Sequence, residues 1–303
     1  MRRLLAAAAL LLAACGPAPD DSIVDVGNGR LGGPARIAPA DLPAFFDCLR
    51  ERGATLVSAH RGGPRPGLSE NAIETFEATL AETPAFMETD VSRTRDGALV
   101  LMHDDTVDRT TNGQGAVSAL TLAQFQTLRL RDGDGAVLET SPPSLEQALA
   151  WADGKTVLEL DIKRSVAYED VVRVVEDAGA MHRVVFVTYS IDGAARLARL
   201  APEAMIYTSI SSPRELDVLE RRGVDLSHIV AWVGTDAPGG ALVQALAERG
   251  VETRFGMFGA NRDYANALRA HAQMVAVDDP AEAGRDLDAA DGAHGHAALQ
   301  CVR

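Results

Sequence analysis

Short apolar runs alternate with longer amphipathic segments along most of this chain. The runs are rich in β-branched residues and have the length of strands; they lie at 55–59, 86–91, 99–102, 157–162, 184–189, 205–210, 229–233, 251–255 and 274–277. Apolar positions recur at helical spacing in 71–82, 144–152, 166–178, 191–200, 213–222, 239–249 and 261–271. Ser144, followed by Gln147, predicts a capping box at the start of one helix. The alternation predicts parallel strands joined by helical crossovers.

The third apolar run differs from the others. Only "SRTRDGA" separates it from the second run, whereas a parallel crossover takes about a dozen residues. The "RDG" in this connection is typical of a hairpin turn. We therefore expect residues 99–102 to pair antiparallel with the end of the second strand. The remaining parallel strands predict an α/β fold, a (β/α)8 TIM barrel. An open doubly wound sheet is disfavoured because the chain lacks a glycine-rich dinucleotide turn.

The connection at 104–143 is unusually long. Its 40 residues show little periodicity, and connections longer than about 12–15 residues without secondary structure usually carry function. In a TIM barrel this segment would leave the C-terminal face, where active sites lie. We expect it to form a small insertion or a lid over that face.

The N-terminus has the pattern of a bacterial lipoprotein signal. A basic "MRR" precedes an apolar stretch of 11 residues, 4–14, which is too short to span a bilayer. It ends in "LAAC", which resembles a lipobox and predicts cleavage before Cys15 and lipidation of Cys15. We therefore expect a signal peptide at 1–14, a flexible tether at 15–40 and the barrel at 41–303. Such a protein would be held at the bacterial cell envelope, in the periplasm or at the cell surface. An ordinary secretory signal is the alternative.

The formal net charge of −14 narrows the range of partners. Nucleic acids and anionic membrane surfaces repel an acidic protein, so we expect no nucleic acid, and membrane attachment only through the lipid anchor. A small anionic substrate would need positive charge supplied locally by the site.

Charged side chains cluster where the predicted strands end. His60 and Arg61 follow the first strand, and the second carries Glu88 and Asp90, two residues apart and therefore on one face. Further candidates at strand ends are His103, Glu159, Asp161 and Lys163. Neighbouring carboxylates raise one another's pKa unless a cation lies between them, and oxygen ligands suit Mg²⁺ or Ca²⁺. With two histidines for proton transfer and two cationic side chains for an anion, the set fits phosphoryl chemistry.

Several motifs resemble those of the bacterial glycerophosphodiester phosphodiesterase family. They are "AHRGG", "SENAIETFEATL", "METDVSRTRDGALVLMHDDTVDRTTNGQGAV", "PPSLEQAL" and "LELDIK", and the resemblance covers residues 56–280. It implies a TIM barrel with an insertion after "HD", and metal-dependent hydrolysis of a small glycerophosphodiester to an alcohol and glycerol 3-phosphate. It also implies an acid–base pair, His60 and His103, phosphate contacts from Arg61 and Lys163, and one divalent cation, Mg²⁺ or Ca²⁺, on Glu88, Asp90 and Asp161.

Some positions depart from the family pattern. Asp161 stands where family members usually carry Glu, so Glu159 is an alternative third ligand. In having Asp at this position the chain resembles sphingomyelinase-D-like relatives on the same fold. The alternative activity is therefore phospholipase-D-like cleavage of lysophospholipid or sphingolipid headgroups. A non-catalytic binding module is disfavoured because the histidines and carboxylates of the pattern are all present. Near the position of a family Trp the chain has Phe255, and we expect this difference to touch the substrate pocket.

Cys48 and Cys301 form an even pair once Cys15 is committed to lipid. Cys48 lies in a predicted helix before the first strand, and Cys301 follows the last strand. The first and last strands of a closed barrel are hydrogen-bonded, so the segments that flank them are neighbours. In an oxidising compartment we therefore expect a Cys48–Cys301 disulfide, with two unpaired thiols as the alternative.

Overall fold

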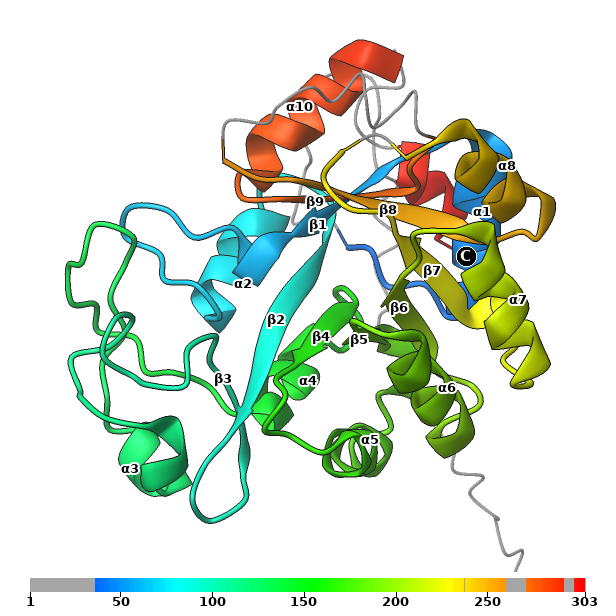
Figure 1. The fold of residues 1–303 in the computed structure, drawn as a ribbon. Coiled ribbons are helices and arrows are strands. Elements are labelled where there is room, and N and C mark those ends of the chain that lie inside the picture. The colour runs from blue at the N-terminus through cyan, green and yellow to red at the C-terminus, as the bar shows by residue number, and fades with distance from the viewer. Residues whose placement is uncertain (1–35, 237, 260–270, 292–296, 303) are drawn as a thin grey trace, which may run out of the picture. The chain divides into compact units, whose positions relative to one another are not determined.

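A sheet of nine strands contains eight parallel ones, which close into a barrel in the computed structural model (Figure 1). The structure describes residues 36–236, 238–259, 271–291 and 297–302, all within one unit of the chain, Gly33–Arg303. The barrel strands are β1 (Leu56–Ala59), β2 (Ala85–Arg93), β4 (Leu158–Ile162), β5 (Val184–Thr188), β6 (Met205–Ser209), β7 (Ile229–Trp232), β8 (Glu252–Met257) and β9 (Met274–Val277). The pairing of β1 with both β9 and β2 closes the sheet and confirms the predicted TIM barrel.

The ninth strand, β3 (Leu99–Leu101), runs antiparallel to the end of β2, as predicted, with Ser92 opposite Val100. The turn between them contains Gly97, whose φ of +88° favours glycine. Its amide donates to the Thr94 carbonyl at 3.1 Å. The hairpin therefore extends the barrel wall beyond its C-terminal rim and delivers the chain to His103.

Helices cover the outside of the barrel (Figure 1). They are α2 (Ile73–Leu80), α4 (Leu145–Ala152), α5 (Tyr168–Asp177), α6 (Ile191–Leu200), α7 (Pro213–Arg221), α8 (Gly240–Glu248) and α10 (Pro280–Asp291). The predicted capping box is present, because the Ser144 hydroxyl accepts from the Gln147 amide and the Gln147 side chain accepts from the Ser144 amide. The predicted signal peptide and Cys15 lie outside the described residues, as does nearly all of the helix predicted at 261–271.

Helix α1 (Leu42–Arg52) packs against inward-facing side chains from the first half of several strands. The rings of Phe45 and Phe46 lie 5.5 and 6.1 Å from that of Phe86, and Phe46 lies 6.3 Å from Tyr207. This aromatic layer fills the N-terminal end of the barrel. A disulfide joins Cys48 of α1 to Cys301, with the Cα atoms 5.7 Å apart across a sequence separation of 253.

The insertion at 104–143 has a small core of its own. Its apolar side chains pack together with two residues of the β3 segment; the buried members are Val100, Met102, Val107, Val117 and Phe125. Regular structure is limited to the one-turn helix α3 (Leu122–Phe125), a 3₁₀ turn and isolated bridges. The segment lies beside β3 (Figure 1). Among the described residues, no helix is both long enough and apolar enough to cross a membrane.

Candidate active site

The turn after β1 directs His60 and Arg61 into the site. Arg61 has a φ of +50°, and Gly62 and Gly63 follow with φ values of +85° and +82°. A Cβ on Gly62 would lie 2.3 Å from the Phe76 ring, and one on Gly63 would lie 2.6 Å from Pro280. The two glycines of "HRGG" are therefore required by both backbone conformation and space. The turn also lets the Arg61 amide donate to Glu88 at 2.7 Å.

Three carboxylates meet at the C-terminal end of the barrel. Glu88 and Asp90 project from the same face of β2, and Asp161 comes from β4, where it is paired in register with Asp90. One oxygen from each residue lies within 4.8 Å of the others, and all three side chains are buried. One of the Asp161 oxygens, Oδ1, is buried and accepts no hydrogen bond. This oxygen-rich cluster fits a hard divalent cation such as Mg²⁺ or Ca²⁺.

The charges within the cluster are unequal. Burial and the adjacent Asp90 and Asp161 raise the pKa of Glu88 well above its usual value. Burial opposes ionisation of Asp90 as well, but Lys163 and Asn71 outweigh it and hold the pKa of Asp90 below its usual value. The ammonium of Lys163 lies 2.6 Å from Asp90 and 3.1 Å from Asp161. Lys163 therefore stabilises the ionised form of Asp90 and also forms an ion pair with Asp161.

Asn71 and Tyr189 hold two of the carboxylates in place, although neither was predicted from the sequence to have a role. Asn71 has a φ of +56°, and its side chain donates to Asp90 at 2.8 Å while accepting from the Asp90 amide at 2.9 Å and the Thr89 hydroxyl at 2.6 Å. The Tyr189 hydroxyl donates to Asp161 at 2.6 Å. The "SEN" motif signalled Asn71, whereas no local pattern marks Tyr189.

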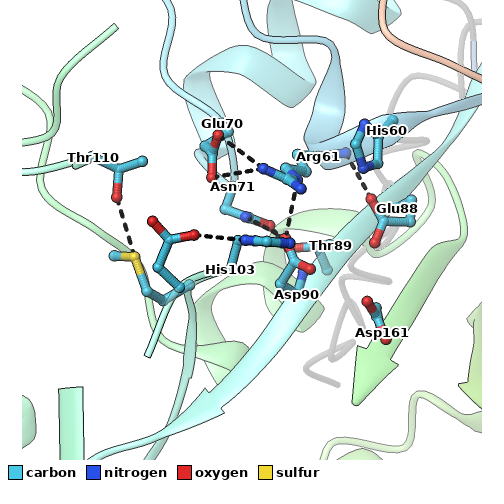
Figure 2. Close-up of polar contacts among 12 residues, drawn as sticks. His60, Arg61, Glu70, Asn71, Glu88, Thr89, Asp90, His103, Thr110 and Asp161 are labelled. Carbon is cyan, nitrogen blue, oxygen red and sulfur yellow. Dashed lines mark hydrogen bonds and ion pairs between the residues drawn. The ribbon is translucent and has the colours of Figure 1, made fainter. Parts of the chain in front are cut away.

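The two histidines lie near the triad, and each is paired with an aspartate. His60 Nδ1 lies 2.8 Å from Asp278 Oδ1, and His103 Nδ1 lies 2.7 Å from Asp104 Oδ1. The hydrogen bond to His60 lowers the pKa of Asp278. With Nδ1 engaged in both rings, Nε2 is the nitrogen available to a substrate. Figure 2 shows His60 next to Glu88, and His103 beside Asp90 on the other side of Arg61.

A pocket of about 200 Å³ opens beside the triad, and His60, Glu88 and Asp161 contribute to its wall. Aromatic side chains supply much of the rest, including Trp232 and Phe258. No residue of the insertion lines this pocket. Of the two expected forms, the small core at 104–143 fits a small insertion.

The expectation that Phe255 touches the pocket is wrong, because its side chain is buried in the core between the barrel and its helices. Side chains alternate along β8, so Gly256, the next residue, faces inward. A Cβ on Gly256 would lie 2.3 Å from the Trp232 ring and 2.7 Å from Phe258. Because Gly256 has no side chain, the rings of Trp232 and Phe258 can occupy this space.

Glu159, the alternative third ligand, is engaged elsewhere. It is fully buried and accepts from Ser58 at 2.6 Å, Arg254 at 2.8 Å and Tyr207 at 3.2 Å. The guanidinium of Arg254 also lies over the Tyr207 and Trp232 rings, at 5.1 and 5.2 Å from their centroids. Glu159 thus belongs to a polar layer within the barrel. Asp161 is the residue of β4 that joins Glu88 and Asp90.

Comparisons with known proteins agree with this geometry. The sequence model of the glycerophosphoryl diester phosphodiesterase family matches residues 60–278, so the chain belongs to that family. It is 30% identical, over 159 residues, to a glycerophosphodiester phosphodiesterase of Caldanaerobacter subterraneus; the alignment covers 50% of this chain and 65% of that protein, just under two thirds of its length.

Solved structures of the family share the fold. A glycerophosphoryl diester phosphodiesterase from Parabacteroides distasonis superposes with a TM-score of 0.77 and 30% identity, over 85% of this chain and 94% of that one. A phosphodiesterase from Oleispira antarctica, solved with the product sn-glycerol-3-phosphate, has a TM-score of 0.59 and 20% identity over 79% and 99% of the two chains.

Proposed function

We propose that this protein is a metal-dependent glycerophosphodiester phosphodiesterase that releases an alcohol and glycerol 3-phosphate. The observation that carries the proposal is the buried carboxylate triad flanked by two histidines, each anchored to an aspartate. Membership of the family and the product bound to the Oleispira enzyme support the choice of substrate.

In this proposal Glu88, Asp90 and Asp161 hold one divalent cation, Mg²⁺ or Ca²⁺. When bound, the cation polarises the phosphoryl oxygens and offsets the negative charge that develops on them. The unpaired Asp161 Oδ1 and the raised pKa of Glu88 both support a cation site, because each reflects buried carboxylate charge that the protein alone does not neutralise.

The proton-transfer roles fall to His60 and His103. One Nε2 takes a proton from the attacking hydroxyl, and the other protonates the departing alcohol. The attacking hydroxyl belongs either to water or to the substrate's own glycerol, which would give a cyclic phosphate that water then opens. Arg61 and Lys163 supply the local positive charge for the phosphate, which a chain of net charge −14 otherwise lacks.

The test is product release from a panel of substrates before and after removal of metal. Glycerophosphocholine, glycerophosphoethanolamine and glycerophosphoglycerol should each be assayed for glycerol 3-phosphate, alongside lysophosphatidylcholine and sphingomyelin for headgroup release. We expect glycerophosphodiesters to be cleaved, activity to be lost in EDTA, and Mg²⁺ or Ca²⁺ to restore it. Full activity after exhaustive EDTA treatment would contradict metal dependence. Release from the lipids alone would instead support the phospholipase-D-like alternative, for which Asp161 is the only argument.

We also propose attachment to the bacterial cell envelope through a lipid on Cys15, with residues 15–40 as the tether. The "LAAC" motif and the short apolar stretch before it support this. Cells grown with labelled palmitate should incorporate label into the protein but not into Cys15→Ala. Equal labelling of both proteins, or of neither, would contradict lipidation at this residue.

A further inference from the structure

Arg109, in the inserted segment, bridges two carboxylates from different parts of the chain. Its guanidinium donates twice to Glu70, both bonds 2.8 Å long. It also donates twice to Asp104, at 2.7 and 3.0 Å. A planar guanidinium with two such pairs of bonds fixes the orientation of both partners.

Each of these carboxylates also contacts a residue of the proposed site. Asp104 is the partner of His103 Nδ1 at 2.7 Å. Glu70, which is nearly buried, accepts from the Arg61 guanidinium at 3.2 and 3.3 Å. Figure 2 shows Glu70 against Arg61, with His103 close by. Arg109 thus stands at the centre of a continuous network that runs from the proton-transfer histidine to the phosphate-binding arginine.

We propose that Arg109 is a positioning residue that holds Asp104 against His103 Nδ1 and Glu70 against Arg61. The proposal rests on the proposed function, in which His103 transfers a proton and Arg61 binds phosphate. When Nδ1–H of His103 donates to Asp104, the neutral ring keeps its Nε2 lone pair directed at the substrate and can act as a base. The protonated ring donates from Nε2 and can act as an acid.

The charges of the network support this role. The hydrogen bonds from Arg109 are the main reason that the pKa of Asp104 lies well below its usual range, so Asp104 remains a carboxylate that accepts from His103. The two guanidiniums and two carboxylates also balance one another, which leaves the network without net charge. A lysine at 109 would carry the charge but not the fork that reaches both acids at once.

The experiment compares Arg109→Met and Arg109→Lys with Arg249→Met in the full mature protein. Arg249, at the C-terminal end of the outer helix α8, is a matched control because its partly exposed guanidinium also lies near two carboxylates, Asp217 at 2.7 Å and Glu220 at 3.7 Å, both on α7. The readouts are steady-state kinetics, metal affinity by calorimetry, and the His103 tautomer from ¹⁵N-histidine NMR, assigned with His103→Asn.

We expect kcat to fall about tenfold to a hundredfold in both Arg109 variants, the range found when partners that orient functional side chains are removed. The His103 spectrum should change from one tautomer to a mixture, while metal affinity stays within about twofold of the wild type. Arg249→Met should match the wild type in all three.

Two results would overturn the proposal: an unchanged His103 tautomer in Arg109→Met, or a kcat within about twofold of the wild type. If Arg109→Met does not fold, the same two criteria apply to Arg109→Lys. An inactive wild type would contradict the proposed function instead, and the tautomer comparison would still decide whether Arg109 positions His103.

Discussion

Asp278 and Asp104 fix the orientation of the two histidine rings beside the carboxylate triad. Each aspartate accepts a hydrogen bond from Nδ1 of its histidine, so Nε2 of each ring is left for chemistry. One aspartate follows its histidine directly in sequence, whereas the other comes from the end of β9, 218 residues after His60. Both rings are therefore oriented in the same way, His103 by its neighbour in sequence and His60 by a residue distant in sequence.

Replacing either histidine should remove a proton-transfer step. We expect His60→Ala and His103→Ala each to lower kcat by about 10²–10⁴, the usual contribution of a positioned acid or base. The wild-type rate should be bell-shaped in pH, and each variant should lose one limb of the profile. His182→Ala, whose ring contacts only Arg183 among the described contacts, is the control and should keep full turnover. Near-normal turnover in either site variant would remove that histidine from the mechanism.

Glu252 should make stability depend on pH away from the site. Burial raises its pKa from 4.5 to about 7, even though Arg50 lies 2.6 Å away. The folded protein therefore binds more protons than the unfolded chain between these two values, so this residue lowers the free energy of unfolding as pH rises through that window. The loss amounts to roughly 3 kcal/mol at most.

Glu252→Gln cannot ionise and should escape this loss. Urea unfolding gives the free energy of unfolding of each protein at each pH. The value for Glu252→Gln minus the value for the wild type should be larger at pH 8 than at pH 5. All other titrating groups are shared by the two proteins and cancel in the comparison. A difference that is the same at both pH values would show that Glu252 ionises normally in the folded protein.

At the scale of elements, the strands followed from the sequence because each is an apolar run bounded by turn residues. The β2–β3 hairpin was also predictable, since "RDG" allows a tight turn and the connection is too short for a crossover. The insertion was recognised only by its length, because its small core is built from single apolar residues rather than from a periodic pattern.

Contacts between elements limited what the sequence could predict about the site. Alternation along β2 and β4 placed Glu88, Asp90 and Asp161 on inward faces. The same reasoning could not separate Asp161 from Glu159, because both face inward. Contacts from other strands distinguish them, since Ser58, Tyr207 and Arg254 engage Glu159. Phe255 was expected at the pocket, but it faces the core outside the barrel and the next residue, Gly256, faces inward, because successive side chains of a strand point to opposite faces.

The glycine turn after β1 offers a test of how an element positions the site. Gly62→Ala and Gly67→Ala both place a Cβ at positive φ, +85° and +80°, but only the first meets another atom within 4 Å, the Phe76 ring at 2.3 Å. Gly67→Ala should therefore lower the free energy of unfolding only through the strain of a positive φ, by about 1–2 kcal/mol. Gly62→Ala should cost about 1–3 kcal/mol more from overpacking, and should lower kcat because His60 and Arg61 move with the turn.

Urea unfolding and kinetics on the two glycine variants separate these effects. Equal stability losses would mean that Phe76 yields without cost. An unchanged kcat in a destabilised Gly62→Ala would mean that the turn does not set the position of His60 and Arg61.

For the whole molecule, closure of the barrel brings the two ends of the described domain together. β1 pairs with β9, α1 fills the N-terminal end of the barrel, and the last described turn lies against α1. Arg52 donates to Gln300 at 2.8 Å in the same region. The Cys48–Cys301 disulfide therefore links segments that already pack together, and it closes nearly the whole chain into one loop.

Removing this disulfide should lower stability without affecting chemistry. A loop with a sequence separation of 253 gives about 5 kcal/mol in the chain-entropy treatment, an upper value because strain and residual structure in the unfolded chain reduce it. Cys48→Ala/Cys301→Ala should therefore unfold at a lower urea concentration than the oxidised wild type, and reduced wild type should approach the variant. The kcat of the double variant should be unchanged, because both cysteines lie at the end of the barrel opposite the triad. Two titratable thiols in protein purified from an oxidising compartment would contradict the disulfide, and equal midpoints for all three samples would contradict its contribution to stability.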